Sequence, residues 1–404
     1  MPKKPAVNND IPERIKVFNK DRDKSVLQLK YKAMAEDVFR FFRGTCGLFY
    51  EELSKKYPFP DSPLVWACGD LHIENFGSYK GSSRLVYFDL NDFDEALLAP
   101  ALWEICRLTA SVQIAAEQIG FSEKETSQLV NTLLYYYRQI LRTGKPIVIE
   151  RETAKGLIKR LVTKVSDRKE GEIVRKRTDD EDANKLLVND KLLAIHRQEK
   201  KAILQAFNQW LPANGHKGLR AIDAGFRIAG TGSIGVKRYL LLLEHKDNDE
   251  KKMLIDIKQA PSSSLSAFNS TKQPLWENEA LRVISVQQMM QHVSPAFLSS
   301  FVYNDECFVV KEIQPTADKV NLALAIKQPS QVESYIANLG MITASAQLRS
   351  SGRKGSATAD ELIVFAERDD WEPILKEWAA GYAEQAKREY AQFRKAWLAG
   401  FFKE

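Results

Sequence analysis

Residues 69–75 carry the side chains with the clearest chemistry in this 404-residue sequence, in the order Gly-Asp-Leu-His-Ile-Glu-Asn. They directly follow a short apolar run. Phosphoryl transfer uses an aspartate beside the attacking hydroxyl and an asparagine, a few residues later, that holds magnesium. Asp70 and Asn75 have that spacing. The segment therefore predicts a catalytic loop. The alternative is a plain turn, in which Asp, His and Asn bond their own backbone.

A second polar segment, residues 88–95, carries four carboxylates within seven positions: Asp89, Asp92, Asp94 and Glu95. Carboxylates this close repel one another unless cations or hydrogen-bond donors compensate them. Magnesium would do so, because hard divalent cations take carboxylate oxygens as ligands. The apolar residues in between anchor the segment, which favours a metal site over an exposed acidic turn.

Residues 230–235, Gly-Thr-Gly-Ser-Ile-Gly, form a glycine-rich loop. In dinucleotide-binding folds such a loop leads into a helix. Here it leads into a strand-like run, and a glycine loop between two strands covers the phosphates of ATP in kinases. Backbone N–H groups can approach phosphate oxygens there because no Cβ intervenes. An ordinary glycine hairpin is the alternative. The predicted nucleotide-contacting residues are Gly230, Thr231, Gly232, Ser233 and Gly235.

Lys258 lies in the next strand-like run, Ile255–Ala260. Kinases place there the lysine that holds the α- and β-phosphates, and they pair it with a glutamate on the following helix. Glu277 and Glu279 are both candidates for that partner, and we favour Glu279. Lys258 is therefore predicted to be a catalytic and a nucleotide-binding residue. A solvated lysine at a strand end would have the same local sequence.

The elements that must position these segments change along the chain. Residues 1–20 are polar and predict no regular structure, whereas residues 25–53 have apolar positions at helical spacing and predict one or two helices. Mostly helical patterns continue to about residue 210, apart from short strands before the two acid-bearing segments. Three strands, a helix and a further strand are then predicted, before the chain becomes helical again from about residue 330.

The order of the motifs indicates a rearranged chain. In kinases the glycine loop precedes the catalytic loop, but here the catalytic segment comes first. A bilobal fold cut at a different surface point gives this order, because chain termini often lie close together. We therefore predict an α+β, protein-kinase-like bilobal fold in circularly permuted order, with a small antiparallel β lobe and a large, mainly helical lobe. The predicted segments are 1–214 for the first part of the helical lobe, 215–320 for the β-rich nucleotide-binding lobe and 321–404 for the second part of the helical lobe.

The composition is typical of a soluble globular protein, with 44% apolar and 28% charged residues and a formal net charge of +6. No apolar run approaches the ~18 residues of a membrane span, and the first ten residues lack the apolar core of a secretory signal. The four cysteines lack metal-type pair spacing and are expected to be buried free thiols. These features predict a cytoplasmic protein without a membrane partner.

Residues 151–180 include ten basic and six acidic residues, so this stretch alone carries +4. It is either a solvated surface or a cradle for a phosphorylated or acidic partner. Aromatic residues do not alternate with the charges, as they do in proteins that bind single strands, so a nucleic-acid partner is not expected. Arg43, together with this stretch, could line an anionic pocket, or it could bond backbone carbonyls at a helix end.

Four motifs occur in an order that resembles the bacterial DUF2252 family, a domain of unknown function: residues 39–44, 69–77, 88–95 and 230–235. This resemblance spans nearly the whole chain, but the family name implies little about activity. Taken separately, the motifs are similar to those of aminoglycoside and choline phosphotransferases, whose fold is protein-kinase-like. In those enzymes the catalytic loop has the pattern G-D-x-H-x-x-N, and the metal-binding aspartate precedes a proline and an acidic helix start.

The resemblance to these phosphotransferases implies roles for individual residues. Asp70 would be the catalytic base, His72 a further catalytic residue and Asn75 a metal ligand. Asp92 would be the second metal ligand, with Asp89 as the competing assignment.

The same resemblance extends to the helix start and to the hinge between the lobes. The helix-start acid would be Glu104, where Asp is usual. The strand Val309–Ile313 would lead into a hinge whose backbone binds adenine, which assigns Lys311, Glu312 and Ile313 to the nucleotide.

Together these segments predict an ATP- and Mg²⁺-dependent phosphotransferase acting on a small hydroxyl- or amine-bearing molecule or on a protein. Asp70 would accept the hydroxyl proton while the γ-phosphoryl group transfers in line. Two alternatives keep the fold: a nucleotidyl transferase that binds ATP in reversed orientation, and a non-catalytic ATP-binding protein. A further alternative is a binder of nucleic acid or another acidic ligand through residues 151–180. The sequence leaves the substrate and the oligomeric state open.

Overall fold

The structure is a computed structural model and describes residues 10–169, 171–314 and 319–403. Its elements, with η for 3₁₀ helices, are α1 (Ile11–Phe18), α2 (Lys24–Met34), α3 (Val38–Gly44), α4 (Cys46–Lys55), β1 (Leu64–Ala67), β2 (Phe76–Lys80), β3 (Val86–Leu90), β4 (Leu97–Pro100), α5 (Ala101–Gln118), α6 (Glu123–Thr143), α7 (Gly156–Ser166), α8 (Glu172–Arg175), β5 (Leu192–Leu193), α9 (Arg197–Ala213), β6 (Leu219–Arg227), β7 (Arg238–His245), β8 (Asn248–Gln259), η1 (Ser264–Ala267), α10 (Glu279–Met290), β9 (Ser299–Tyr303), β10 (Glu306–Glu312), η2 (Leu322–Ala325), α11 (Pro329–Arg349), α12 (Ala359–Glu367) and α13 (Glu372–Leu398).

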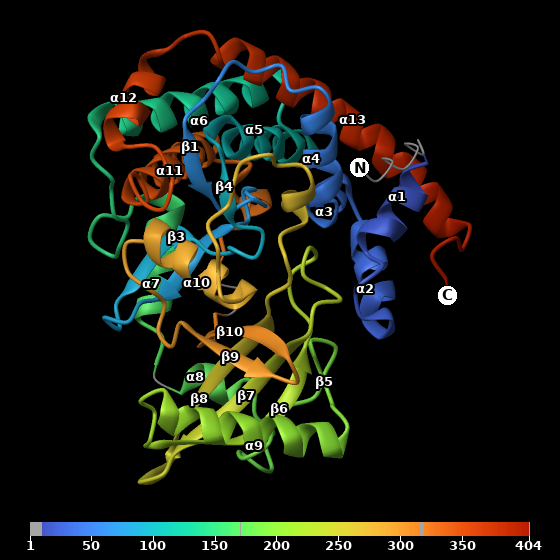
Figure 1. Cartoon of the computed structure of the whole chain (residues 1–404), viewed down its shortest axis with the longest axis vertical. Coiled ribbons are helices and arrows are strands. Elements are labelled where there is room, and N and C mark those ends of the chain that lie inside the picture. Colours follow the sequence, from blue (N-terminus) through green and yellow to red (C-terminus); the bar gives the residue numbers. More distant parts are fainter. Residues whose placement is uncertain (1–9, 170, 315–318, 404) are drawn as a thin grey trace.

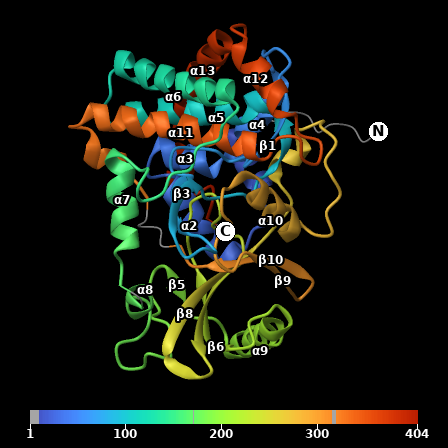
Figure 2. The same cartoon turned by 90° about the vertical axis from the view of Figure 1, so that its left-hand side faces the viewer.

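These helices and antiparallel strands form a mixed α+β fold, as the sequence predicts. A larger, mainly helical lobe contains α5, α6, α11 and α13, and a smaller lobe is built on the largest sheet (Figure 1). The view from the side shows α7 running from the helical lobe towards the sheet lobe (Figure 2). Both the first and the last elements of the chain, α1 and α13, belong to the helical side of the molecule.

The smaller lobe is a six-stranded antiparallel sheet with the strand order β5-β6-β7-β8-β10-β9. Strands β6 to β8 form the predicted meander, and residues 230–235 lie in the connection between β6 and β7. Helix α9 packs on the sheet through Ile203, Phe207 and Leu211. Because α9 precedes residue 215, the sheet lobe begins earlier along the chain than the predicted boundary.

Strand β9 was not predicted, since most of its residues are exposed or half-buried and it has no clear apolar alternation.

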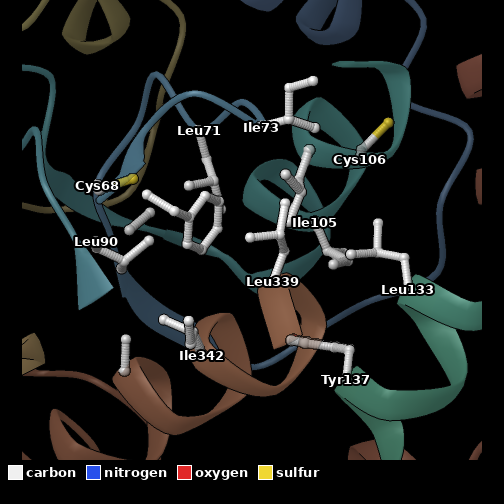
Figure 3. Close-up of a cluster of buried hydrophobic side chains, with 14 of the residues drawn as sticks. Cys68, Leu71, Ile73, Leu90, Ile105, Cys106, Leu133, Tyr137, Leu339 and Ile342 are labelled. Atoms are coloured by element: carbon white, nitrogen blue, oxygen red, sulfur yellow. The ribbon is translucent and has the colours of Figure 1, made fainter. Parts of the chain in front are cut away.

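The helical lobe holds the polar loops through its apolar core. Helix α5 lies at its centre, with 15 of its 18 residues buried, so the charged residues Glu104 and Arg107 are buried with it. Leu71 and Ile73, from the loop after β1, extend into the apolar cluster made by α5, α6 and α11 (Figure 3). This packing fixes the backbone of the loop that carries the predicted catalytic residues.

Residues Ile11–Phe18 form helix α1, which corrects the prediction of irregular structure for this part of residues 1–20. Residues 1–9, which that prediction also covered, lie outside the described residues. Ile11 and Ile15 of α1 pack with Tyr31 of α2 and Phe393 of α13. Helices this short are marginal in isolation and are stabilised mainly by tertiary packing. The polar sequence of this segment therefore did not predict the helix. The segment 25–53 likewise forms three helices, α2 to α4, rather than one or two.

None of the described helices combines the length and the apolar character needed to cross a membrane. All four cysteines are free thiols, of which three are buried and Cys307 is partly buried.

Candidate functional site

A cavity between the lobes is lined by segments that lie far apart in the sequence. Its walls come from the N-terminal helices, the loops after β1 and β3, the glycine loop and the face of the sheet. The structure thus brings most of the predicted site residues to a common space. The predicted residues that line it are Asp70, His72, Asn75, Asp92, Gly230, Gly232, Ser233, Lys258 and Lys311.

The loop after β1 is held at its start by backbone contacts. Gly69 has a φ of +87°, a left-handed conformation that favours glycine, and a Cβ there would lie 2.3 Å from the carbonyl oxygen of Glu95. The Tyr50 hydroxyl donates to the Gly69 carbonyl oxygen at 2.5 Å. The Cys68 N–H donates to Glu104 at 2.6 Å, and burial raises the pKa of the Glu104 carboxyl. Helix α5 therefore anchors the loop through the predicted helix-start acid.

Asp70 is fixed by an arginine that the sequence pattern did not single out. Its Oδ1 accepts hydrogen bonds from Arg107 Nε at 2.9 Å and from Nη2 at 2.5 Å. The buried Arg107 guanidinium lies over the rings of Phe42 and Phe49, 4.1 and 4.9 Å from their centroids. The Oδ2 atom of Asp70 lies 3.5 Å from the position that a Cβ on Gly232 would take. One carboxylate oxygen is thus bound by arginine, and the other faces the glycine loop.

Asn75 and Asp92 present oxygen atoms to the same cavity. The Asn75 amide nitrogen donates to the Asp70 carbonyl oxygen at 2.7 Å, which leaves its amide oxygen available to a cation. Burial alone would raise the pKa of Asp92, but Lys258 and Lys311 outweigh burial and lower it. The carboxylate is therefore held ionised at neutral pH.

The chemistry of these donors fits magnesium. Among the described residues there is no group of three or more His, Cys, Asp or Glu side chains arranged to hold a metal ion. Magnesium does not need one, because it keeps several waters and takes ligands from substrate phosphates. Asn75 and Asp92 would hold it, and it would neutralise negative charge on the phosphates.

Asp89, the competing metal ligand, does not line the cavity. Its Oδ2 accepts a hydrogen bond from Arg349 Nη2 at 2.8 Å, and its Oδ1 accepts one from the Leu90 N–H at 2.9 Å. The Asp89 alternative is therefore contradicted, because an arginine of α11 already neutralises this buried carboxylate.

His72 lines the cavity, but both of its ring nitrogens face protein donors. Arg43 Nε lies 3.2 Å from Nε2, and the Glu74 N–H lies 3.2 Å from Nδ1. Burial and the adjacent guanidinium lower the pKa of His72 well below its ordinary value. A neutral imidazole accepts a hydrogen bond at only one of its two nitrogens, so only one of these contacts can be a full hydrogen bond. The contacts and the burial of the ring favour a role in ordering the loop over the predicted catalytic role.

The glycine loop is tied to the N-terminal helices. Lys30 Nζ donates to the Gly232 carbonyl oxygen at 3.1 Å, and Arg22 Nη1 donates to the Ile234 carbonyl oxygen at 2.7 Å. Lys30 is buried, and burial together with the neighbouring Arg22 lowers the pKa of its ammonium group well below the ordinary value. Arg22 and Lys30 are therefore positioned to set how closely the loop lies over Asp70.

Two of the five predicted loop residues do not line the cavity. Thr231 is buried away from it, and Gly235 packs on Arg22, where a Cβ would lie 2.8 Å from the arginine Cβ. The nucleotide contacts predicted for Thr231 and Gly235 are thus not supported by their placement.

Lys258 reaches across the cavity to the loop after β3. Its Nζ forms an ion pair with Asp94 and lies 3.6 Å from Asp92 Oδ1. Burial would lower the pKa of Lys258, but these carboxylates outweigh it and raise the pKa. The predicted partner, Glu279, pairs instead with Arg282, one turn further along α10. The Lys258–Glu279 pair is therefore wrong, because each residue has a nearer partner of opposite charge.

The predicted adenine-binding strand end also differs. Lys311 lines the cavity, but Glu312 and Ile313 do not. The Glu312 N–H donates to the Ala296 carbonyl oxygen and the Ile313 N–H to the Leu254 carbonyl oxygen, both at 3.0 Å. These two donors are already used within the protein, which contradicts the prediction that they bind adenine.

Most of the segments that line the cavity also belong to the part of the chain that matches a family model. The family model described as "Uncharacterized protein conserved in bacteria (DUF2252)" matches residues 22–396. The chain belongs to the DUF2252 family. No curated protein and no solved structure matches it. Every cavity-lining segment except residues 15–19 lies within the match to the DUF2252 model.

Among the described residues of this DUF2252 chain, none of 151–180 lines the cavity, whereas Lys176 and Arg177 line a separate pocket. Arg43 lines the cavity and pairs with Glu74, so Arg43 and the basic stretch do not share one anionic pocket. The other cationic lining residues were not predicted; they are Arg22, Lys30, Arg227, Arg238 and Lys319.

Arg107, which the sequence analysis did not single out, could have been recognised from the sequence as a residue of the site. Glu104 and Arg107 are two charges three positions apart in a run of α5 that is otherwise uncharged up to Glu117. Charged residues are almost never fully buried unless paired. Such a pair in a buried helix therefore predicts polar partners, and here these are the Cys68 N–H and the Asp70 carboxylate, at the start of the predicted catalytic loop.

Gly69→Ala is expected to destabilise the protein by at least about 1 kcal/mol more than Gly215→Ala. Both glycines have left-handed backbone, with φ of +87° and +85°, so both variants incur about 1–2 kcal/mol of strain. Only at Gly69 would the new Cβ also collide with backbone, that of Glu95, because Gly215 has open space. Chemical unfolding of the two variants measures the difference in the free energy of unfolding. Equal losses in the two variants would contradict the expected collision with the Glu95 backbone.

Proposed function

We propose that this protein is an ATP- and Mg²⁺-dependent phosphotransferase with a protein-kinase-like fold in circularly permuted order. The observation that carries the proposal is the approach of Gly232 to Asp70 in a cavity that Asn75 and Asp92 also line. A glycine loop, a carboxylate base and two oxygen ligands for magnesium are the groups that phosphoryl transfer requires.

The arrangement of the sheet lobe supports the kinase-like fold. The glycine loop joins β6 and β7, Lys258 lies on β8, and α10 follows, which is the order of these parts in kinases. Circular permutation is supported by the packing of α1, the first described helix, against α13, the last, on the helical lobe. Termini that lie together can be joined, and the chain opened elsewhere, without loss of the fold.

The chemistry follows from the two oxygens of Asp70. Its Oδ1 is held by Arg107, so its Oδ2, which faces the glycine loop, is the atom that would take the proton of an acceptor hydroxyl. Lys258 lies between the sheet and the acidic loop, where it would bind a phosphate oxygen. Since Gly232 lies against Asp70, the glycine loop must lift to admit an acceptor.

Binding of ATP with magnesium tests the proposal before any acceptor is known. We expect ATP with Mg²⁺ to raise the unfolding temperature of the wild type, because a ligand at 100 times its Kd adds about 2.7 kcal/mol of stability. Asp92→Asn should lose the magnesium-dependent part of this shift. The exposed Asp249 on the β7–β8 hairpin is the matched control, and Asp249→Asn should behave as the wild type. The absence of any shift with ATP and magnesium would refute the proposal.

A further inference from the structure

The face of the sheet that lines the cavity is charged. Arg227 of β6, Arg238 of β7, Asp256 and Lys258 of β8, and Lys311 of β10 all line it. The strand register makes them neighbours, since Arg238 lies opposite Lys258 and Lys311 lies opposite Asp256. These five side chains carry a net charge of +3, and Lys258 also pairs with Asp94 of the facing loop.

The internal ion pairs leave part of this charge uncompensated. Asp256 binds both arginines, Arg227 Nη1 at 2.8 Å and Arg238 Nη2 at 2.5 Å. Within the described residues Lys311 is half-buried and forms no direct hydrogen bond or ion pair, although its charge interacts with those of Asp92 and Asp256. An ammonium group without a direct partner is stabilised by an added anion, so this face favours one.

The same face does not suit a nucleobase. No large aliphatic or aromatic side chain lines the cavity from β6, β7, β8 or β10 within the described chain, and a flat uncharged ring there would desolvate the cations without pairing them. Most of the large apolar side chains of the cavity lie on the N-terminal helices instead. They are Ile15 and Phe18 of α1 and Leu48 of α4, and Val236 follows the glycine loop. Phe18 is the only Phe, Tyr or Trp among the described lining residues.

We infer that a nucleoside triphosphate binds with its phosphate chain under the sheet, against Arg238, Lys258 and Lys311, and with its base towards Phe18. Guanidinium and ammonium groups are the usual partners of phosphate oxygens. This orientation is the reverse of the one that the hinge prediction required. The inference rests on the ATP- and Mg²⁺-binding site and the Asp70 base of the proposed function, but it changes the phosphorus that is attacked from the γ to the α position.

In this orientation the phosphate nearest the nucleoside lies closest to Asp70, because Asp70 lies beside Arg43 and Gly232 near the N-terminal helices. The acceptor hydroxyl would give its proton to Asp70 Oδ2, and its oxygen would bond the α-phosphorus. The bond between the α-phosphorus and the bridging oxygen would break, and the electron pair would leave with pyrophosphate, whose charge the sheet cations neutralise. The reaction is therefore nucleotidyl transfer, the alternative that the sequence left open.

Binding measurements with ATP, tripolyphosphate and adenosine on the full chain test the orientation without turnover. Tripolyphosphate alone should bind and compete with ATP. Lys311→Met should weaken both by about tenfold or more and should fold normally, because it removes no hydrogen bond or ion pair among the described residues. Lys237→Met is the matched control: it directly precedes β7, pairs with Glu306 and does not line the cavity. Phe18→Ala should weaken ATP but not tripolyphosphate.

Two results would overturn the inference while leaving the proposed function intact. One is that Lys311→Met weakens adenosine but not tripolyphosphate, which would place the base under the sheet. The other comes from labelled ATP: transfer of the γ-label with release of ADP contradicts nucleotidyl transfer, whereas transfer of the α-label with release of pyrophosphate supports it. Absence of any binding of ATP or tripolyphosphate would refute the proposed function as well.

Discussion

Asp70→Asn is expected to lower the rate of ATP turnover by about 10²–10⁴-fold, the usual contribution of a general base. Asparagine keeps the oxygen that accepts the hydrogen bonds of Arg107 at 2.5 and 2.9 Å, so the loop should keep its shape. It replaces the free carboxylate oxygen with an amide nitrogen, which cannot take a proton from an acceptor. Turnover is measured as consumption of ATP with either label, because the base is needed whichever phosphorus is attacked.

Affinity for ATP with magnesium separates this effect from a loss of binding. The Asp70→Asn variant should bind ATP with magnesium as the wild type does, since Asn75 and Asp92 are unchanged. Asp92→Asn, which removes a predicted metal ligand, should lose the magnesium-dependent part of ATP binding together with turnover. Unchanged turnover in Asp70→Asn would exclude Asp70 as the base and would leave the acceptor proton to water.

Arg107→Ala is expected to destabilise the protein by about 3–5 kcal/mol, the range found when one member of a buried ion pair is removed. Arg107 is fully buried and binds Asp70 Oδ1 and the Phe42 carbonyl oxygen. Truncation leaves these acceptors without their donor and opens a space between the rings of Phe42 and Phe49, over which the guanidinium lies. The free energy of unfolding from a urea titration measures the loss.

Arg151→Ala is the control for this measurement. Arg151 pairs with Asp167 at 2.6 Å, but both side chains are about half exposed, and such surface pairs contribute about 0–1 kcal/mol. Arg107→Lys gives the second comparison, because lysine keeps the charge but cannot donate through two nitrogens. If Arg107→Ala cost no more than Arg151→Ala, the buried pair would not hold the loop.

The sequence by itself determined the local chemistry. The types and spacing of Asp70, Asn75 and Asp92, the glycine loop, the meander and the mixed α+β class could all be inferred, because turns, strands and loops depend on neighbouring residues. Gly69 illustrates the link, since its left-handed φ of +87° is a property of one residue in its own turn. The predicted boundary at 215 was wrong because α9 carries the periodicity of any amphipathic helix, and only packing assigns it to the sheet lobe.

Only the tertiary structure decided which groups face one another. Lys258 pairs with Asp94 rather than Glu279, and Asp70 is held by Arg107, which lies in α5. The charged face under the sheet depends on register, which places Lys311 opposite Asp256. These pairings join residues that no local pattern relates, and burial strengthens them because the low-dielectric interior leaves a charge little to interact with except its nearest partner.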